Sequence, residues 1–407
     1  MPDYVDAYEG SFKRGRPWRE FPGTEQPDAA LAEYGKGAEI VVRVSIVPLL
    51  TAGLLAACSP QGGSAPSSAA PPPASAAKPA AKPAAAASPL QARVDAINNA
   101  QFTAPPPPQP AAPPVLNPPP DPSLIKAEVL LARAEASPGS IDGLAGSNLK
   151  RAVKAYQQMS SQPTDGVLSA ALWARLTAQA SGPVAAIYTV TAQDVAGPFY
   201  PDVGENMVAA AKLASPGYAR PSEMLAERFH MSEKLLLALN PGADLTKSGT
   251  ALVVVQPAIP ALAPVDHLEV DKAAASVRAY AADGTLVASF PATVGSTDRP
   301  SPSGVHKVRG VAFNPTYTYD PAKLTFGPRK HGKFIIQPGP NNPVGIVYIA
   351  LDRPGYGLHG TPEPDKIGKT ASHGCVRLTN WDALLLSHAV KPGVVVSFVH
   401  ARGGKAA

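Results

Sequence analysis

The sequence predicts a multidomain α+β protein, and three observations support this. With 407 residues the chain is long enough to hold several domains. Nineteen of its 48 prolines fall between residues 59 and 122, which separates the start of the chain from the rest. Beyond this stretch, apolar residues recur first with helical spacing and later with the alternation of short strands. We therefore expect two small modules followed by a larger β-rich domain.

Residues 1–57 are expected to be a secretion signal region. A mostly apolar run of 14 residues follows Arg43 and ends in Leu-Ala-Ala-Cys58. This run is too short to span a bilayer as a helix, and its order is that of a secretion signal. The ending resembles the lipobox of bacterial lipoproteins, which implies a lipid anchor on Cys58, and Ser59 then implies the outer membrane. The alternative is an ordinary signal peptide with an incidental cysteine. Residues 1–40 are long and polar for such a signal and suggest a misassigned translation start.

Residues 58–122 are expected to form a disordered linker. They consist mainly of Pro, Ala, Ser, Gln and Lys, and such a segment buries too little apolar surface to offset the entropy lost on ordering. Leu90, Val94 and Ile97 are spaced as in one or two turns of helix. We interpret the linker as a tether between a membrane anchor and a more distant substrate; a spacer of no particular length is the alternative.

Residues 123–180 are expected to form three short amphipathic helices around a small core. Ser123 is the expected N-cap of the first, with Pro122 outside it. Pro138-Gly139 ends this helix, and Asp165-Gly166 forms the turn before the third. The segments PGSIDGLAGSNLKRAVKAYQ and DGVLSAALWARL resemble the peptidoglycan-binding type 1 domain. The resemblance implies docking on the cell-wall polymer; a spacer bundle that no longer binds is the alternative.

Residues 184–257 are expected to fold as strand, helix, helix, strand. Both helices open on serines, Ser222 and Ser232, and the second ends at Asn-Pro-Gly242. The order, with YTV, SEMLAERFHMSEKLLLALNPG and LTKSGTALVVV, resembles a LysM module, which implies binding of N-acetylglucosamine-containing glycans. Residues 191–220 are an insertion where the family has a short turn. The alternative is a packing platform for the domain that follows.

Residues 265–400 contain many short strands, which favours a sandwich or barrel. Asp283-Gly284 is a hairpin turn between two of the strands. One clear helix opens at Thr379, with Asp382 at the spacing of a capping box. Residues Asn314 to Pro321 are a Pro-bounded loop whose Tyr317 and Tyr319 either cover the substrate or are plain surface aromatics.

The stretch from His359 to Leu378 carries the chemistry. Its segments are HGTP, IG and SHGCVRL. A cysteine thiolate attacks carbonyl carbon well, but a free thiol is mostly protonated at neutral pH and needs a base or a cation beside it. Two histidines, His359 and His373, lie near Cys375 in sequence. Gly374 allows backbone N–H groups to approach an oxyanion, and Arg377 presents a guanidinium that suits a carboxylate.

HGT, IG and SHGCVRL together resemble the signature of the L,D-transpeptidases with a YkuD-type catalytic domain. The resemblance implies a β-sandwich in which Cys375 is the nucleophile and His359 the general base. It further implies that the carbonyl of Gly360 orients the imidazole and that the backbone around Gly374 and Cys375 forms the oxyanion hole. The side chains expected to line the substrate site are His373, Arg377, Ser372, Tyr317 and Tyr319. Ser301-Pro302-Ser303-Gly304 departs from the family's usual Thr-Pro-Thr-Gly, without an expected effect on the chemistry.

The expected reaction is acyl transfer from a peptidoglycan stem tetrapeptide, with no cofactor. The acceptor is a diaminopimelate side chain, which gives a 3–3 cross-link, or a protein amine, which attaches that protein to the wall. Water as acceptor makes the same site a carboxypeptidase or amidase, and a non-catalytic wall-tethering lipoprotein is a further alternative. A zinc site is disfavoured because no fourth ligand has metal spacing. Nucleic acid is not an expected partner, because no basic cluster with interleaved aromatics occurs. The expected location is the periplasmic side of the cell envelope.

Overall fold

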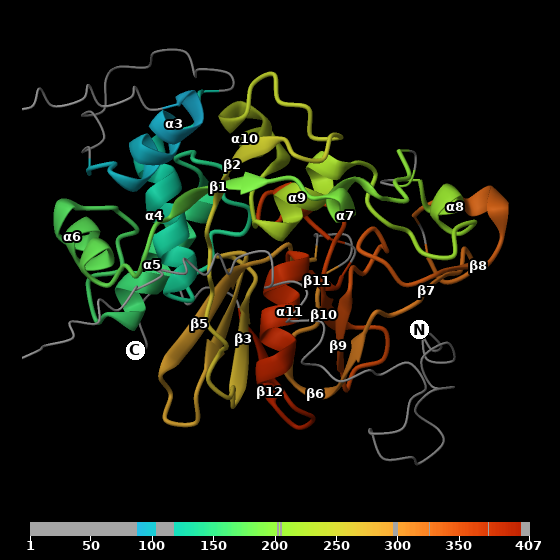
Figure 1. The fold of residues 1–407 in the computed structure, drawn as a ribbon. Coiled ribbons are helices and arrows are strands. Elements are labelled where there is room, and N and C mark those ends of the chain that lie inside the picture. The colour runs from blue at the N-terminus through green and yellow to red at the C-terminus, as the bar shows by residue number, and fades with distance from the viewer. Residues whose placement is uncertain are drawn as a thin grey trace, which may run out of the picture.

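The computed structural model describes residues 88–102 and 118–399, apart from residues 202, 204, 205, 296–299, 325 and 373. The expected signal region with Cys58, and most of the expected linker, lie outside these residues. Figure 1 shows the elements that precede residue 256 on one side of the molecule and the main sheet on the other. In the part of the chain that the structure describes, no helix is long and apolar enough to cross a bilayer.

Three helices lie in the region where three were predicted. They are α4 (Pro122–Arg133), α5 (Ser147–Met159) and α6 (Ala170–Ala178). The prediction of Ser123 as the cap of α4 was wrong. Asp121 is the N-cap, because its carboxylate accepts a hydrogen bond from the Ser123 N–H at 2.7 Å. Pro122 is the first helical residue, a position where a missing N–H removes no helical hydrogen bond.

Helix α3 (Pro89–Asn98) corrects the expectation that all of residues 58–122 form a disordered linker. Val94 and Ile97 are buried, and α3 packs against α4 and strand β1. The Asn98 amide oxygen accepts hydrogen bonds from the N–H groups of Val184 and Ala185, at 2.8 and 2.9 Å, and its nitrogen donates to the Ala185 carbonyl. The end of α3 thus pairs with the edge of β1 as a strand would, and the helix belongs to the folded part of the chain.

The predicted strand, helix, helix, strand order is present. It consists of β1 (Ala185–Thr189), α9 (Pro221–Arg228), α10 (Glu233–Leu239) and β2 (Ala251–Val255). Strands β1 and β2 pair antiparallel, from Ala185 opposite Val255 to Thr189 opposite Ala251. The expected insertion between β1 and α9 contains two short helices, α7 (Ala192–Val195) and α8 (Met207–Ala210).

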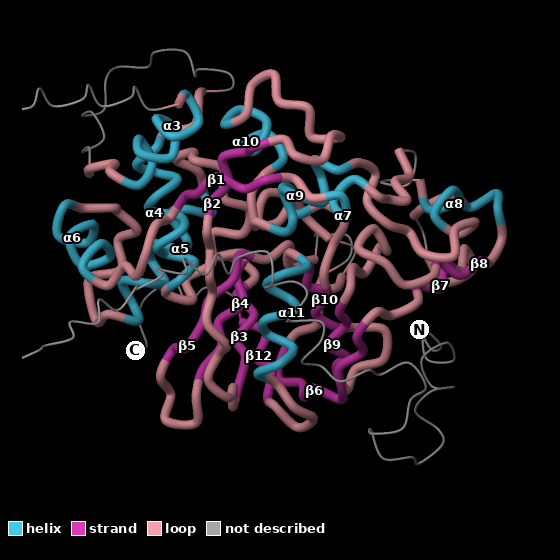
Figure 2. Tube along the Cα trace, viewed as in Figure 1, coloured by secondary structure: helices cyan, strands magenta, loops and turns pink. Residues whose placement is uncertain are grey.

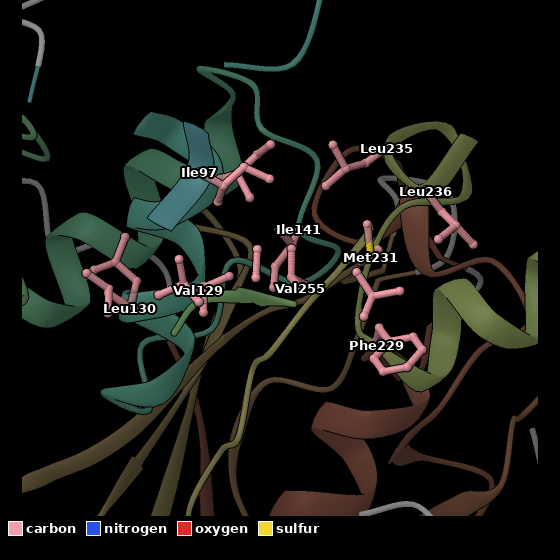
Figure 3. Close-up of a cluster of buried hydrophobic side chains, with 14 of the residues drawn as sticks. Ile97, Val129, Leu130, Ile141, Phe229, Met231, Leu235, Leu236 and Val255 are labelled. Atoms are coloured by element: carbon pink, nitrogen blue, oxygen red, sulfur yellow. The ribbon is translucent and has the colours of Figure 1, made fainter. Parts of the chain in front are cut away.

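The two N-terminal modules share one hydrophobic core instead of forming two separate ones. Figure 3 shows Ile97, Val129 and Ile141, from the first module and α3, in one cluster with Met231 and Val255 of the second. Arg133 joins the segments that follow each module. Its guanidinium donates to the carbonyls of Ser181, Gly182, Pro183, Gln256 and Pro257.

The β-rich domain contains ten strands among the described residues. They are β3 (His267–Asp271), β4 (Ser276–Tyr280), β5 (Leu286–Pro291), β6 (Gly304–Phe313), β7 (Tyr317–Tyr319), β8 (Phe334–Ile336), β9 (Val347–Leu351), β10 (Gly357–His359), β11 (Val376–Arg377) and β12 (Val395–Val399). Two 3₁₀ turns, η1 (Arg329–His331) and η2 (Pro364–Lys366), and helix α11 (Asn380–Ala389) complete it.

Eight of these strands form one continuous sheet in the order β11-β10-β9-β6-β12-β3-β4-β5, and β7 pairs with β8 beside it. The long strand β6 pairs with β12 in its first half and with β9 in its second, with a register shift between Val308 and Gly310. Both halves of the sheet contribute to one core together with α11. Figure 2 shows this helix beside the strands. The expected β-sandwich is therefore a single sheet that curls at β6.

Helix α11 begins as predicted at Thr379, whose side chain accepts a hydrogen bond from the Asp382 N–H at 3.1 Å. The Asp382 carboxylate does not complete a capping box. It accepts a hydrogen bond from the Ser137 hydroxyl of the first module at 3.0 Å. Burial raises the pKa of Asp382 to about 7. In the folded protein the Asp382 carboxyl therefore stays protonated up to about pH 7.

We expect Asp382→Asn to change how stability depends on pH. Because the folded pKa lies above the unfolded value of about 3.9, the contribution of Asp382 is fully present below pH 4 and is lost as the pH rises through about 7. Asparagine does not titrate, so the free energy of unfolding of the variant, relative to wild type, should rise by up to about 4 kcal/mol between pH 4 and 8. Urea denaturation across this range measures the free energy of unfolding of both proteins. If the two free energies change with pH in parallel, the prediction is contradicted.

Candidate active site

Strands β10 and β11 place the residues of the two motif segments side by side. They pair in parallel, with Leu358 opposite Val376 and His359 opposite Arg377. Leu358 and Val376 are buried in the core. Because side chains alternate along a strand, His359 and Arg377 lie on the other face of the sheet, and so does Cys375, which directly precedes β11. The fold thus brings together residues that are 16 positions apart in sequence.

His359 is held as a neutral base. It is 4% exposed, and its Nδ1 lies 2.7 Å from the Gly360 carbonyl oxygen, the contact that the motif implied. A carbonyl oxygen only accepts, so Nδ1 carries the proton and Nε2 keeps a lone pair. Burial, and then the positive charge of Arg377, lower the pKa of His359 to about 3. The imidazole is therefore uncharged at neutral pH.

Cys375 is a protonated thiol in the resting protein. The residue is partly buried. Its Sγ donates a hydrogen bond to the Gly355 carbonyl at 3.6 Å. Burial raises the pKa of the thiol, and hydrogen bonds from the Gly357 backbone and the Tyr348 side chain, together with the charge of Arg377, oppose the rise. Both the thiol and the imidazole are thus neutral before any reaction.

The loop before Cys375 is closed by its own hydrogen bonds. Gly374 has φ +121°, where an L side chain is strained. The Ser372 hydroxyl donates to the Cys375 carbonyl at 2.5 Å and accepts from the Gly374 N–H at 3.2 Å. Ser372 is 2% exposed and shapes the loop, and its expected contact with substrate stays a prediction. The Gly374 N–H, expected in the oxyanion hole, is engaged by this hydroxyl.

Tyr317 and Tyr319, expected at the substrate site, lie in a buried cluster that also contains Tyr348. Both rings are buried in the β7–β8 hairpin, where they pack with Val203 and Ala210 of the insertion that precedes α9. The Tyr319 hydroxyl donates to the Phe326 carbonyl at 2.8 Å. The insertion of the second module covers the hairpin, so both rings are core residues and not the surface aromatics of the alternative, and their contact with substrate stays a prediction.

Arg377 is fixed on both sides of its backbone. It pairs with His359 in β10, and its N–H and carbonyl exchange hydrogen bonds of 2.9 Å with Thr293. Its half-buried guanidinium lies close enough to the imidazole to lower the pKa of His359. His373, the other histidine of the motif, lies outside the described residues, and its role stays a prediction.

Tyr348 is a site residue that sequence reasoning missed. It lies opposite His359 in β9, and the two rings stack with centroids 5.8 Å apart and an interplanar angle of 12°. Gly357 makes room for this ring, since a Cβ there would lie 2.6 Å from the Tyr348 Cζ. Only the register of β9 against β10 identifies this tyrosine, and the sequence does not fix that register.

Ser301 was also missed, although its segment had been noted as a departure from the family pattern. It is 3% exposed, and its hydroxyl donates to the Gly374 carbonyl at 2.7 Å and accepts from the Gly295 N–H at 2.9 Å. The expectation that the departure leaves the chemistry untouched overlooked this contact with the cysteine loop.

We expect Ser301→Ala to slow acylation of Cys375 by about tenfold, because a small displacement of a reacting group has a large effect on rate. The substitution leaves the Gly374 carbonyl without its donor. Ser303→Ala is the matched control, since this residue is exposed and its hydroxyl accepts a hydrogen bond from Lys272. Acylation is followed by mass spectrometry of Cys375. Equal rates in the two variants would contradict a role for Ser301 in holding the loop.

Two parts of the chain match known domain families. Residues 265–397 match the L,D-transpeptidase catalytic domain, YkuD. Residues 121–176 match the putative peptidoglycan binding domain. A solved structure, L,D-transpeptidase 3 from Mycobacterium tuberculosis, aligns with a TM-score of 0.28 and 16% identity over 37% of this chain and 68% of that one.

Three relatives are similar to somewhat less than half of this chain. The probable L,D-transpeptidase YbiS of Escherichia coli K12 is 30% identical over 204 residues, which cover 48% of this chain and 65% of the relative. The probable L,D-transpeptidase ErfK/SrfK of the same organism is 31% identical over 185 residues, 44% of this chain and 59% of the relative. The alignment thus spans about two thirds or less of these two proteins. The putative L,D-transpeptidase YkuD of Bacillus licheniformis is 31% identical over 180 residues, 43% of this chain but 91% of the relative. This chain therefore belongs to the YkuD family of L,D-transpeptidases.

Proposed function

We propose that this protein is a cysteine-dependent L,D-transpeptidase that acts on the stem peptides of peptidoglycan. The observation that supports it most is the pairing of His359 with Arg377 in the strand that Cys375 precedes. This supports the proposal because the imidazole, with Nε2 unprotonated, lies on the face of the sheet that carries the thiol. Family membership and the peptidoglycan-binding match supply the substrate class.

In the first half-reaction, Cys375 Sγ attacks the carbonyl carbon between the third and fourth residues of a stem tetrapeptide. The thiol proton passes to His359 Nε2 as the C–S bond forms, because both groups start neutral. With the Gly374 N–H engaged, the Cys375 amide is the candidate donor to the oxyanion. The C–N bond then breaks, and His359 returns the proton to the departing D-alanine amine. The product is a thioester on Cys375.

In the second half-reaction, an amine attacks the thioester carbon and gives a proton to His359. The C–S bond breaks, and the thiolate takes that proton back. A diaminopimelate side chain as acceptor gives a 3–3 cross-link, and a protein amine gives attachment of that protein to the wall. Water in place of the amine makes the site a hydrolase. Arg377 and His373 are the candidate residues to bind the stem peptide.

The other modules hold the catalytic domain on the wall in this proposal. The helices α4 to α6 bind peptidoglycan, and β1, α9, α10 and β2 bind its glycan strands as a LysM-like module does. A lipid on Cys58 anchors the chain to the outer membrane from the periplasmic side. The residues between this anchor and α3 form the tether.

The proposal is tested with the full chain and purified disaccharide-tetrapeptide, with Cys375→Ala as the blank. Mass spectrometry follows the mass of the protein and of the products. We expect a thioester on Cys375 and a cross-linked dimer that has lost one D-alanine, both absent from the blank. Tripeptide and free D-alanine alone would replace the transpeptidase by a hydrolase. Absence of both adduct and turnover would overturn the enzymatic proposal in favour of a wall-tethering protein.

A further inference from the structure

Asn380, the first residue of α11, bonds to two backbone segments beside the candidate base. It is fully buried, and its Oδ1 accepts hydrogen bonds from the N–H groups of Thr361, at 3.0 Å, and Ile346, at 3.3 Å. Thr361 follows Gly360, whose carbonyl orients His359. The Thr361 N–H and the Gly360 carbonyl belong to one peptide unit, so the Asn380 amide binds one end of the group whose other end fixes the tautomer of the base.

The fit around this amide leaves no room for movement. A Cβ on Gly360 would lie 2.2 Å from Asn380 Oδ1, and a Cβ on Gly345 would lie 2.1 Å from the same atom. Both distances are far below van der Waals contact, so the backbone passes directly against the amide oxygen. A rotation of the Asn380 side chain would therefore displace Gly360 and its carbonyl.

The orientation of the Asn380 amide is set by four partners, and one of them, Glu227, lies outside the catalytic domain. Its Nδ2 donates to the Glu227 Oε1 of α9 at 3.0 Å and to the Pro340 carbonyl at 3.2 Å. A carboxylate or a carbonyl can only accept, whereas the Thr361 and Ile346 N–H groups can only donate. This arrangement permits one of the two orientations of the amide, the one that presents Oδ1 to the backbone beside His359.

Glu227 is buried where the second module packs on the catalytic domain. It is 4% exposed and also accepts a hydrogen bond from the Tyr218 hydroxyl at 3.2 Å. A buried carboxylate is costly unless its partners are well placed, and an apolar residue would pack more simply. Next to it, His230 stacks on Trp381 with ring centroids 4.9 Å apart. In Figure 1, α9 lies over the N-terminal end of α11.

We propose that Glu227 is a positioning residue for His359, so that the second N-terminal module completes the active site. The chain of contacts runs from Glu227 through the Asn380 amide to Thr361 and the Gly360 carbonyl, and ends at Nδ1 of His359. The module acts on the base without touching the substrate. This inference rests on the proposed role of His359 in acyl transfer.

The test compares Glu227→Met, Glu227→Gln and Glu223→Met in the full chain. Methionine removes the acceptor at similar volume, and glutamine keeps an acceptor oxygen. Glu223 is the matched control, since it lies one turn earlier on α9 and accepts from another asparagine of the catalytic domain, Asn341, at 3.1 Å. One readout is kcat and KM on the disaccharide-tetrapeptide. The other is the rate of alkylation of Cys375 by iodoacetamide between pH 6 and 9, read by mass spectrometry.

We expect Glu227→Met to lower kcat and the alkylation rate at pH 7 by about tenfold, with KM unchanged. Glu227→Gln should stay within about twofold of wild type, and Glu223→Met should change neither rate. Wild-type rates in Glu227→Met, an equal loss in Glu227→Gln, or an equal loss in Glu223→Met would each overturn the proposal. Alkylation needs no peptidoglycan, so it tests the positioning role even if the wild-type chain does not turn over the substrate.

Discussion

Replacing His359 with asparagine is expected to lower the rate of thioester formation on Cys375 by about 10³-fold at pH 7. The Asn amide nitrogen takes the place of Nδ1 and keeps the hydrogen bond to the Gly360 carbonyl. What is lost is Nε2, the lone pair that receives the thiol proton. Burial raises the pKa of the Cys375 thiol, so few molecules carry a thiolate without help from a base.

The pH dependence identifies this loss as the loss of a base. In wild type the pKa of His359 is lowered to about 3, so the imidazole is already unprotonated throughout pH 5 to 8 and adds no slope there. In His359→Asn the reaction depends on the free thiolate, whose population rises about tenfold for each pH unit below the thiol pKa. The two rates should therefore converge as the pH rises. A variant within tenfold of wild type at pH 7 would remove His359 from the mechanism.

Gly360→Ala should have the second largest effect, a loss of about 10²-fold in thioester formation. The new methyl group would lie 2.2 Å from Asn380 Oδ1, and Asn380 is fully buried, so the backbone of residue 360 has to move. That movement carries away the carbonyl that accepts from His359 Nδ1. The imidazole can then adopt its other tautomer, in which Nε2 carries the proton and accepts nothing.

Gly284→Ala is the control for the general destabilisation that follows when a glycine is replaced by alanine. Gly284 has φ +83° in the turn between β4 and β5, with open space around its Cα. Gly284→Ala should cost about 1 kcal/mol of stability through backbone strain and leave acylation unchanged. Thermal unfolding and acylation kinetics are measured on both variants. If Gly360→Ala loses activity only above its Tm, the loss reflects unfolding and not the position of the base.

Local patterns predicted those parts of the protein in which neighbours in sequence are neighbours in space. The helices α4 to α6 and the βααβ order followed from apolar spacing, and the hairpin between β4 and β5 followed from Asp283-Gly284. Of the expected serine caps, Ser232 was confirmed, whereas Ser123 and Ser222 were wrong, because Asp121 and Arg220 are the N-caps. The motif residues His359 and Cys375 were expected together because the family motif carries both, and strands β10 and β11 place them on one face.

Long-range contacts were not predictable, since hydrophobic spacing does not identify the partner of a side chain. Tyr319 has the sequence context of an exposed loop, but the insertion before α9 covers it. Asp382 stands at capping-box spacing, yet Ser137, 245 positions earlier, takes its carboxylate. Glu227 and Asn380 are 153 positions apart and carry no common motif. Each of these contacts depends on how the N-terminal modules dock on the catalytic domain. The spacing of apolar residues within one segment carries no information about that docking.

The shared core of the two N-terminal modules has a consequence for how the protein is made and dissected. Asn98 bonds to residues 86 and 87 positions later, and Val255 of β2 is buried in the same cluster as Ile97. During synthesis, the first module cannot reach its final state until β2 has left the ribosome. A fragment that starts at residue 123 would lack α3 and expose the surface that this helix covers. The natural boundary for a shortened protein is therefore before Ser88, the N-cap of α3, and the N-terminal half should unfold as one cooperative unit.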